Sequence, residues 1–205
     1  GVQVATIDET NQIRTLLAKA VVMACPKFVA AKVIPNLEPE SRSAIASLKY
    51  RSYVVANVLV KGKVAPSFYD LFLLGQARGW PKNILAEALQ AGAQDVILGT
   101  LASPSAEHTV LTLYKALPHD GARAQLYAPD AFENHRRKFE TQIAESILPL
   151  LGISKDRWQG LRIARWGHPI PLSEPGLISD GIVHALRKPF KDRVFFVSQD
   201  NWLLP

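Results

Sequence analysis

The chain has 205 residues, a formal net charge of +6 and a mean hydropathy near zero (+0.04). This length suffices for one large domain or two small ones. The composition is typical of a soluble globular protein, because no apolar run approaches the roughly 18–20 residues that span a bilayer. The single cysteine excludes an intrachain disulfide and a cysteine-based zinc site. One thiol does not fix the compartment, although the cytoplasm is slightly favoured.

The positive charge is mild, and the lysines and arginines are scattered along the chain. It could favour an anionic ligand, but it does not by itself predict nucleic-acid binding. The densest basic patch, residues 135–138, is interpreted as the solvated face of a predicted helix. A nucleic-acid or acidic-partner binder that uses Arg136, Arg137 and Lys138 remains a weaker alternative. The histidines show no metal-ligand spacing, so no metal site is predicted.

The N-terminal residues predict a β-hairpin that leads into a buried strand. Residues 2–7 and 12–17 favour strands, and the turn chemistry of residues 8–11 separates them. The short β-branched run 21–25 is typical of a buried strand. It should end at Pro26, which has no N–H to donate to a strand ladder.

The middle of the chain predicts strands that follow one short helix. The helix is expected over residues 39–48, where proline and glutamate suit a first turn. The β-branched and aromatic content of the later segments favours strands. These segments are strands over 50–60, 95–101 and 108–116, a strand or irregular arm over 67–74, and a loop over 75–81.

The strongest predicted helix begins at Asp130, where Glu133 completes a capping-box pattern. Gly152 is placed to end this helix. Five apolar side chains recur along it with helical spacing, so we expect that face to lie in the core rather than to bind a ligand. The five are Phe132, Phe139, Ile143, Ile147 and Leu150.

Three segments in a fixed order carry a further pattern. Residues 20–26 are Ala-Val-Val-Met-Ala-Cys-Pro, residues 164–171 end a predicted strand over 161–166 and include Arg-Trp-Gly-His-Pro, and residues 191–202 include Val-Phe-Phe-Val-Ser-Gln-Asp. The three segments resemble the VV-x-A-x-P strand, the RW crossing segment and the last FAD-domain strand of the flavin-dependent amine oxidases. In that family the first strand leaves the FAD domain for the substrate domain, and the second segment returns.

The resemblance implies that the chain is the C-terminal part of a flavoprotein. Residues 1–36 would complete the β-meander and crossover strand of the FAD domain, residues 37–165 would form the substrate-binding domain, and residues 166–205 would return to a truncated last strand. The Gly-rich fingerprint that cradles a pyrophosphate would lie outside the chain. The predicted fold class is α+β, with a mixed, largely antiparallel sheet covered by helices on one side.

The resemblance also implies site residues on the flavin side. Lys32 lies six residues after Pro26, where monoamine oxidases carry a lysine that holds a water near the flavin N5, so it is the catalytic candidate. A solvated lysine is the alternative. Ser198 replaces a glycine of the family, and its Cβ puts a close backbone approach to the cofactor in doubt. Asp200 matches an acidic residue that contacts the ribityl or phosphate part of FAD, with a turn residue as the alternative.

Two tryptophans and a histidine complete the candidate site. Trp166 and Trp202 are the nearest candidates for the aromatic residues beside the cofactor, although Trp166 could instead be a core residue at a domain interface. His168 is the candidate substrate-binding residue. A loop histidine beside a proline is the structural alternative.

The implied function is oxidation of an amine C–N bond by hydride transfer to FAD, with this chain supplying the substrate-binding part. The chain alone is expected to be inactive and to bind no FAD. Its expected partners are a small-molecule amine and an N-terminal FAD-binding half, with no nucleic acid and no membrane span; an exposed apolar face could drive dimerisation. Two alternatives remain: a desaturase-like or dehydrogenase member that does not use oxygen, and a stand-alone α+β ligand- or protein-binding module without a cofactor.

Overall fold

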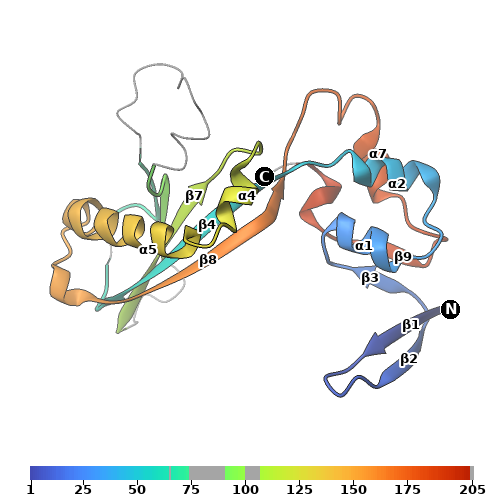
Figure 1. Ribbon diagram of the computed structural model, residues 1–205, viewed down its shortest axis with the longest axis horizontal. Coiled ribbons are helices and arrows are strands. Elements are labelled where there is room, and N and C mark those ends of the chain that lie inside the picture. The colour runs from blue at the N-terminus through green and yellow to red at the C-terminus, as the bar shows by residue number, and fades with distance from the viewer. Residues whose placement is uncertain (65, 74–90, 100–106, 204–205) are drawn as a thin grey trace. The chain divides into compact units, whose positions relative to one another are not determined.

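The computed structural model describes residues 1–64, 66–73, 91–99 and 107–203. They form two compact units, one built from Gly1–Lys49 together with Ile170–Pro205 and the other from Tyr50–Pro169. The chain therefore leaves the first unit once and returns to it (Figure 1). The fold is α+β with a largely antiparallel main sheet, as predicted. The predicted loop over 75–81 and the ends of the predicted strands at 74 and 101 lie outside the described residues.

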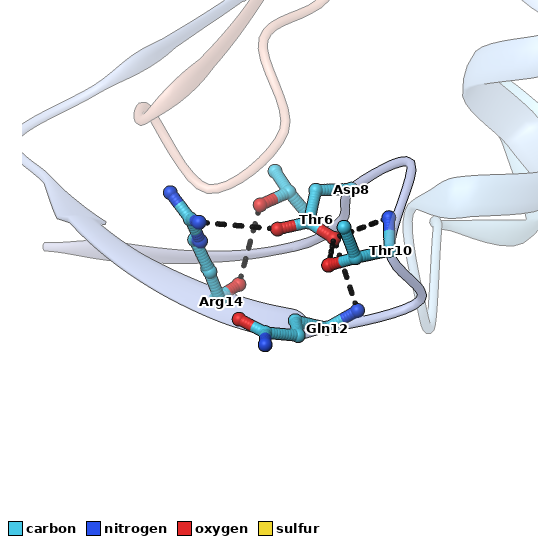
Figure 2. A network of polar contacts seen from close by, with 5 residues as sticks. All are labelled: Thr6, Asp8, Thr10, Gln12 and Arg14. Atoms are coloured by element: carbon cyan, nitrogen blue, oxygen red, sulfur yellow. Dashed lines mark hydrogen bonds and ion pairs between the residues drawn. The ribbon is translucent and has the colours of Figure 1, made fainter.

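The first unit begins with the predicted hairpin, β1 (Val2–Ile7) and β2 (Ile13–Ala18), which pair antiparallel. Its turn is organised by Asp8, as Figure 2 shows. The Asp8 Oδ1 atom accepts hydrogen bonds from the Thr10 amide (2.9 Å), the Thr10 hydroxyl (2.6 Å) and the Gln12 amide (3.1 Å). Arg14 adds an ion pair of 3.1 Å to the other carboxylate oxygen. Local side-chain bonds of this kind make Asp a strong turn residue, so this hairpin could be predicted from sequence.

The third strand, β3 (Val21–Met23), does not join the hairpin. It pairs in parallel with β9 (Val194–Phe196), with Val21 opposite Val194. The prediction of a buried strand is wrong in its burial, because Val22 is 62% exposed in the described structure. A three-residue strand in a two-stranded sheet leaves one of its faces without packing partners. The strand ends at Met23, ahead of Pro26.

Helices cover the rest of this unit: α1 (Lys27–Val33), α2 (Pro39–Ala46), α7 (Ile182–Arg187) and the short 3-10 turn η4 (Gln199–Asn201). The predicted helix over 39–48 is confirmed by α2, whose proline occupies the first turn. The helix α1 was not predicted from the sequence. Helix α2 packs against both α1 and α7 and buries Ala44 and Ile45.

The second unit contains a five-stranded sheet in the order β5-β6-β7-β4-β8. Antiparallel pairing joins β5 to β6, β6 to β7 and β7 to β4. The four strands predicted over residues 50–60, 95–101, 108–116 and 161–166 are confirmed as β4, β6, β7 and β8. The segment predicted as a strand or an irregular arm, residues 67–74, contains the short strand β5. The strands are β4 (Tyr50–Lys61), β5 (Asp70–Phe72), β6 (Asp95–Leu98), β7 (His108–Ala116) and β8 (Trp158–Pro171).

One face of this sheet is buried under α4 (Ala122–Leu126) and α5 (Ala131–Gln142), which Figure 1 shows in yellow in front of the strands. Every second residue of β4, from Val54 to Val60, is fully buried in this core. The opposite side chains of β4 are only half-buried or exposed. The alternation fits a sheet that packs on one side.

The predicted long helix is confirmed, but it is interrupted. After α5 the chain makes a π-helical turn, η2 (Ile143–Ile147), and a last turn, α6 (Leu148–Leu150). Gly152 ends it at φ +65°. The Gly152 amide bonds to the Pro149 carbonyl and the Ile153 amide to the Leu148 carbonyl, which is a Schellman motif. The predicted capping box is wrong, because the Asp130 side chain makes no cap hydrogen bond.

The apolar stripe of this helix is only partly correct. Phe139, Ile143 and Ile147 are fully buried, as predicted, but Leu150 is 61% exposed and Phe132 is half-buried. Leu148 is buried in place of Leu150. A π turn contains more residues than an α turn, so it rotates all later side chains around the helix axis.

Candidate functional site

The candidate site is the edge at which β3 and β9 both end. The strands are parallel, so their carboxyl ends lie together, and a 2.9 Å bond from the Val197 amide to the Met23 carbonyl extends the pairing. Beyond this edge the chain turns into α1 after Pro26 and into η4 after Ser198. Ligands of open α/β sheets bind outside the carboxyl ends of parallel strands.

Asp200 connects the two ends of the chain at this edge. It is 4% exposed, and its Oδ2 atom accepts a 2.7 Å hydrogen bond from the Lys27 backbone amide. Lys27 is the first residue of α1. The first amides of a helix have no partner within the helix, and a carboxylate there is also favoured by the helix dipole. Asp200 therefore caps α1 from a position 173 residues further along the chain.

Lys27 is a buried cation that sequence reasoning missed. It is 1% exposed, its ammonium donates a hydrogen bond to the Leu186 carbonyl of α7, and the same group lies 3.8 Å from the ring centroid of Phe196. Burial lowers the pKa of Lys27 to about 8, opposed by the charge of Asp200 and by Cys25. Lys27 does not belong to any repeating pattern of apolar residues, and lysines are almost never buried unless paired. Its burial could therefore not be predicted from the sequence.

Two polar atoms at this edge are buried without a hydrogen-bond partner among the described residues, Ser198 Oγ and Asn201 Oδ1. Asn201 is 8% exposed, and its Nδ2 atom donates a 2.7 Å bond to the Phe196 carbonyl. Buried polar atoms are almost always paired, so the Ser198 hydroxyl fits a bound polar group such as a hydroxyl or a phosphate ester. The Asn201 amide oxygen only accepts hydrogen bonds, so it fits a bound donor such as a hydroxyl. Ser198 was predicted from the sequence, and Asn201 was not.

Two further predicted residues belong to the same unit. Lys32 lies exposed in the last turn of α1, where a cation also complements the helix dipole. Trp202 is 56% exposed, and the guanidinium of Arg187 stacks 4.3 Å from its ring centroid. Their roles remain predictions.

Trp166 and His168 lie on β8 in the other unit, Tyr50–Pro169, and are described there by themselves. Trp166 is 53% exposed. The His168 ring packs edge-on against Tyr50, with 5.7 Å between ring centroids. A histidine ring packed edge-on against a tyrosine is compatible with the structural alternative for this residue. Its predicted role in substrate binding remains a prediction.

Across residues 1–64, 66–73, 91–99 and 107–203, no three His, Cys, Asp or Glu side chains gather in a way that could hold a metal ion. None of the helices in the same ranges is both long and apolar enough to cross a membrane.

No family model and no curated protein matches the sequence. Solved structures do share the fold. Cyclohexylamine oxidase from Brevibacterium oxydans IH-35A superposes with a TM-score of 0.56 over 97% of this chain, at 16% identity. Reduced UDP-galactopyranose mutase superposes with a TM-score of 0.51 over 93% of this chain, at 11% identity. This chain spans only 40% and 37% of those two proteins, respectively. At such identities the likeness shows the fold alone.

Proposed function

We propose that this chain is part of an FAD-dependent oxidoreductase that oxidises the C–N bond of an amine. The observation that carries the proposal is the parallel pairing of β3 with β9. It joins, in one register, the first and the last of the three segments that resemble the amine oxidases. The fold likeness to cyclohexylamine oxidase over nearly the whole chain supports the same assignment.

The residues at the strand ends have distinct proposed roles. FAD, when bound, supplies the hydride acceptor. Ser198 and Trp202 would contact the cofactor, and Asp200 would both contact it and hold α1 in place. The orphaned Ser198 hydroxyl fits a polar cofactor atom. In the Tyr50–Pro169 unit, the family resemblance gives Trp166 a role in cofactor binding and His168 a role in substrate binding.

The experiment that tests the proposal is the visible absorption spectrum of the full-length gene product, measured beside that of this chain. A flavin band in the longer protein, absent from this chain, is the expected result. If neither protein binds flavin after incubation with FAD, the proposal is wrong. The alternative, a stand-alone binding module without a cofactor, would then be favoured. A flavin-loaded protein that no amine reduces would remove amine oxidation but keep the flavoprotein.

The fold likeness to UDP-galactopyranose mutase favours a second candidate, an enzyme that rearranges a sugar nucleotide. The two candidates differ in substrate, so anaerobic mixing separates them. Amines should bleach the flavin band if the first is correct. UDP-galactose, rather than an amine, should be converted if the second is correct.

Lys32 is the proposed residue for holding a water beside the flavin. Replacing it with methionine in the longer protein should slow reoxidation of the reduced flavin by oxygen, on the order of 10²-fold, because a positive charge favours the developing negative charge. Lys19→Met, which changes an exposed lysine of the same unit, is the control. Equal reoxidation rates for both variants and the unchanged protein would remove this role.

The proposed partner of this chain is the N-terminal FAD-binding half. Exposed apolar side chains of the hairpin, Ile7, Ile13 and Leu17, are 66%, 75% and 84% exposed. They share one face of the hairpin, because Ile7 lies opposite Ile13 and Leu17 opposite Gln3. An apolar face of this kind is typical of an interaction surface.

A further inference from the structure

The strand β5 is the shortest strand of the main sheet and lies at one end of it. Asp70–Phe72 pairs with β6 on one side, and the sheet order places no described strand on its other side. A backbone hydrogen bond flanks this pairing at each end. The Leu98 amide donates to the Tyr69 carbonyl at 2.7 Å. The Leu73 amide donates to the Gln94 carbonyl at 2.8 Å. Short elements at the edge of a fold open locally at a lower free energy than its centre.

Two carboxyl groups, one from β5 and one from β6, meet on one face of this edge. Asp95 lies opposite Phe72, and Asp70 precedes Phe72 by two residues, so the three side chains point to the same face. This face is opposite the core, because Val96, which follows Asp95, is fully buried in the core. Asp70 and Asp95 are diagonal neighbours, whose side chains can reach each other across an antiparallel pair. The Oδ1 atom of each is buried and has no hydrogen-bond partner among the described residues.

Protonation decides whether these two carboxyl groups attract or repel each other. Two carboxylates offer only acceptors, so neither can donate a hydrogen bond to the other. A proton on one of them supplies the missing donor. Burial, the hydrogen bond with Asp70 and the charge of Asp70 raise the pKa of Asp95 to about 6. The pair titrates as a unit, and once both members are ionised their like charges repel each other across β5 and β6.

The described groups that surround the pair do not neutralise its charge. On β7, Tyr114 lies opposite Asp95, and on β4 the Tyr53 ring contacts Tyr114 edge-on, with 6.3 Å between ring centroids. Burial raises the pKa of Tyr53, opposed by the charge of Arg51 on the same strand. Within the described part of the chain, no cation contributes to the shift in the pKa of Asp95. Lys115 follows Tyr114 on β7 and therefore points to the opposite, helix-covered face.

We propose that Asp70 and Asp95 form a proton-dependent latch, which holds β5 on β6 in acid and loosens that attachment toward neutral pH. When the strand is closed, the pair shares one proton; when it opens, both carboxyls enter water and regain the ordinary acidity of aspartate. The closed state therefore binds more protons, so the latch contributes fully below about pH 4 and is lost as pH rises through about 6. The ratio of open to closed strand should rise roughly 10- to 100-fold across this window, with 100-fold as the limit because water screens half-exposed groups. The latch is independent of the proposed flavin chemistry.

The test is hydrogen exchange of the whole, isotope-labelled chain, followed by NMR between pH 4 and pH 8, with rates corrected for the intrinsic effect of pH on exchange. Protection of the Leu73 and Leu98 amides should fall roughly 10- to 100-fold. Their exchange should depend little on low urea concentrations, because a local opening exposes little surface. The Gln94 amide is the internal reference, since it bonds to the Tyr114 carbonyl at 2.9 Å on the β7 side of β6.

Two results would overturn the latch. If Leu73 and Leu98 have the same protection and urea dependence as Gln94, β5 opens only when the whole unit unfolds. If their protection does not change with pH, the carboxyl pair does not control the strand.

Three variants assign the effect to the carboxyl pair. Asp95→Asn keeps a hydrogen-bond donor to Asp70 at every pH, so the Leu73 and Leu98 amides should be as protected at pH 8 as at pH 4. Asp70→Asn removes the other charge and should have the same effect. Asp120→Asn is the matched control, because it removes a charge from an exposed side chain of the same unit, and the fall in protection should remain. An unchanged fall in both pair variants, or its loss in the control, would show that other groups control the strand and that the proposal is wrong.

Discussion

Asp200 and Lys27 show, at the scale of single residues, how a buried charge can serve the fold. The carboxylate accepts the first amide of α1, and the lysine side chain reaches across to α7 and the ring of Phe196. Through these contacts, Asp200 and Lys27 connect α1, α7 and β9. Removing one partner of such a buried group leaves the other unpaired, and that costs more than the interaction itself gains.

We predict that Asp200→Ala destabilises the start of α1 by about 1–3 kcal/mol, the range expected when a buried hydrogen-bonding partner or a helix cap is lost. Hydrogen exchange of the Lys27 amide, measured by NMR, should become faster by the corresponding factor. Asp200→Asn keeps an acceptor and should restore most of the protection. Unchanged exchange of the Lys27 amide in Asp200→Ala would show that the cap is not formed in solution.

The pKa of Lys27 gives a second prediction, on pH. Its folded value of about 8 lies below the ordinary lysine value of about 10.4, so the folded state disfavours the charged form. The unfolded chain therefore binds more protons between these two pH values, and the free energy of unfolding should rise with pH across that window. Lys27→Met removes this dependence.

The measurement is denaturant unfolding of both proteins between pH 7 and pH 11, and the difference between the two curves isolates Lys27 from Lys115, whose pKa is also about 8. Parallel curves over the whole range would contradict the prediction.

At the scale of elements, the π turn decides which side chains of the long helix enter the core. It rotates Leu150 outward and brings Leu148 inward. The Schellman motif at Gly152 then fixes where the helix ends. A plain α-helical pattern would place Leu150 and Ile147 on the same face, so paired substitutions can distinguish the two arrangements.

We predict that Ile147→Ala lowers the stability of the Tyr50–Pro169 unit by about 2–5 kcal/mol, as for other large-to-small core substitutions. Leu150→Ala should change it by no more than about 0.5 kcal/mol, as at other exposed sites. Urea unfolding followed by tryptophan fluorescence measures both. Similar losses for the two variants would mean that the helix is continuous in solution.

The edge of the main sheet carries another element-scale prediction. Asp95 on β6 and Asp70 on β5 lie close, and their Oδ1 atoms are buried without partners among the described residues. Burial, a hydrogen bond with Asp70 and repulsion from it raise the pKa of Asp95 to about 6. The protonated form is favoured on folding, so this contribution to stability is complete below about pH 4 and is lost as pH rises through 6.

Asp95→Asn should therefore remove a fall in stability between pH 4 and pH 7 and should stabilise the protein at pH 8. Unfolding curves of the two proteins at several pH values give the comparison. A variant less stable than the unchanged protein at pH 8 would contradict the raised pKa.

At the scale of the whole molecule, two compact units share one chain that leaves the first and returns to it. The first unit holds the parallel pair β3–β9 and an exposed hairpin; the second holds the one-sided five-stranded sheet. Two strands in a sheet are marginal unless other elements cover them. We therefore expect a binding partner to stabilise the first unit more than the second.

We predict that the chain alone self-associates through the hairpin face that carries Ile13 and Leu17 at micromolar concentration, because this face is apolar and exposed. Light scattering of the Ile13→Lys, Leu17→Lys double variant should give the monomer mass. Leu59→Lys, a partly exposed position on the main sheet, is the control. A monomeric unchanged chain would exclude this surface as a dimer contact.

The sequence by itself determined those helices, strands and turns that depend on interactions between residues close together in the chain. The hairpin follows from Asp8 and its neighbours, α2 from its leading proline, and the strands of the main sheet from their β-branched runs. The α+β fold class followed from the order of these elements. Each of these signals acts within a few residues, so no knowledge of the rest of the chain was needed.

Only the tertiary structure decided what distant residues do to one another. The burial of Lys27, the cap that Asp200 provides and the pairing of β3 with β9 join parts of the chain about 170 residues apart, and no local pattern encodes them. The candidate residues Ser198 and Asp200 were found because they lie in a segment with a family pattern. Lys27 and Asn201 were missed, and His135 is 5% exposed although residues 135–138 were predicted to lie on a solvated helix face. Burial of a polar side chain depends on which elements pack around it rather than on its sequence neighbours.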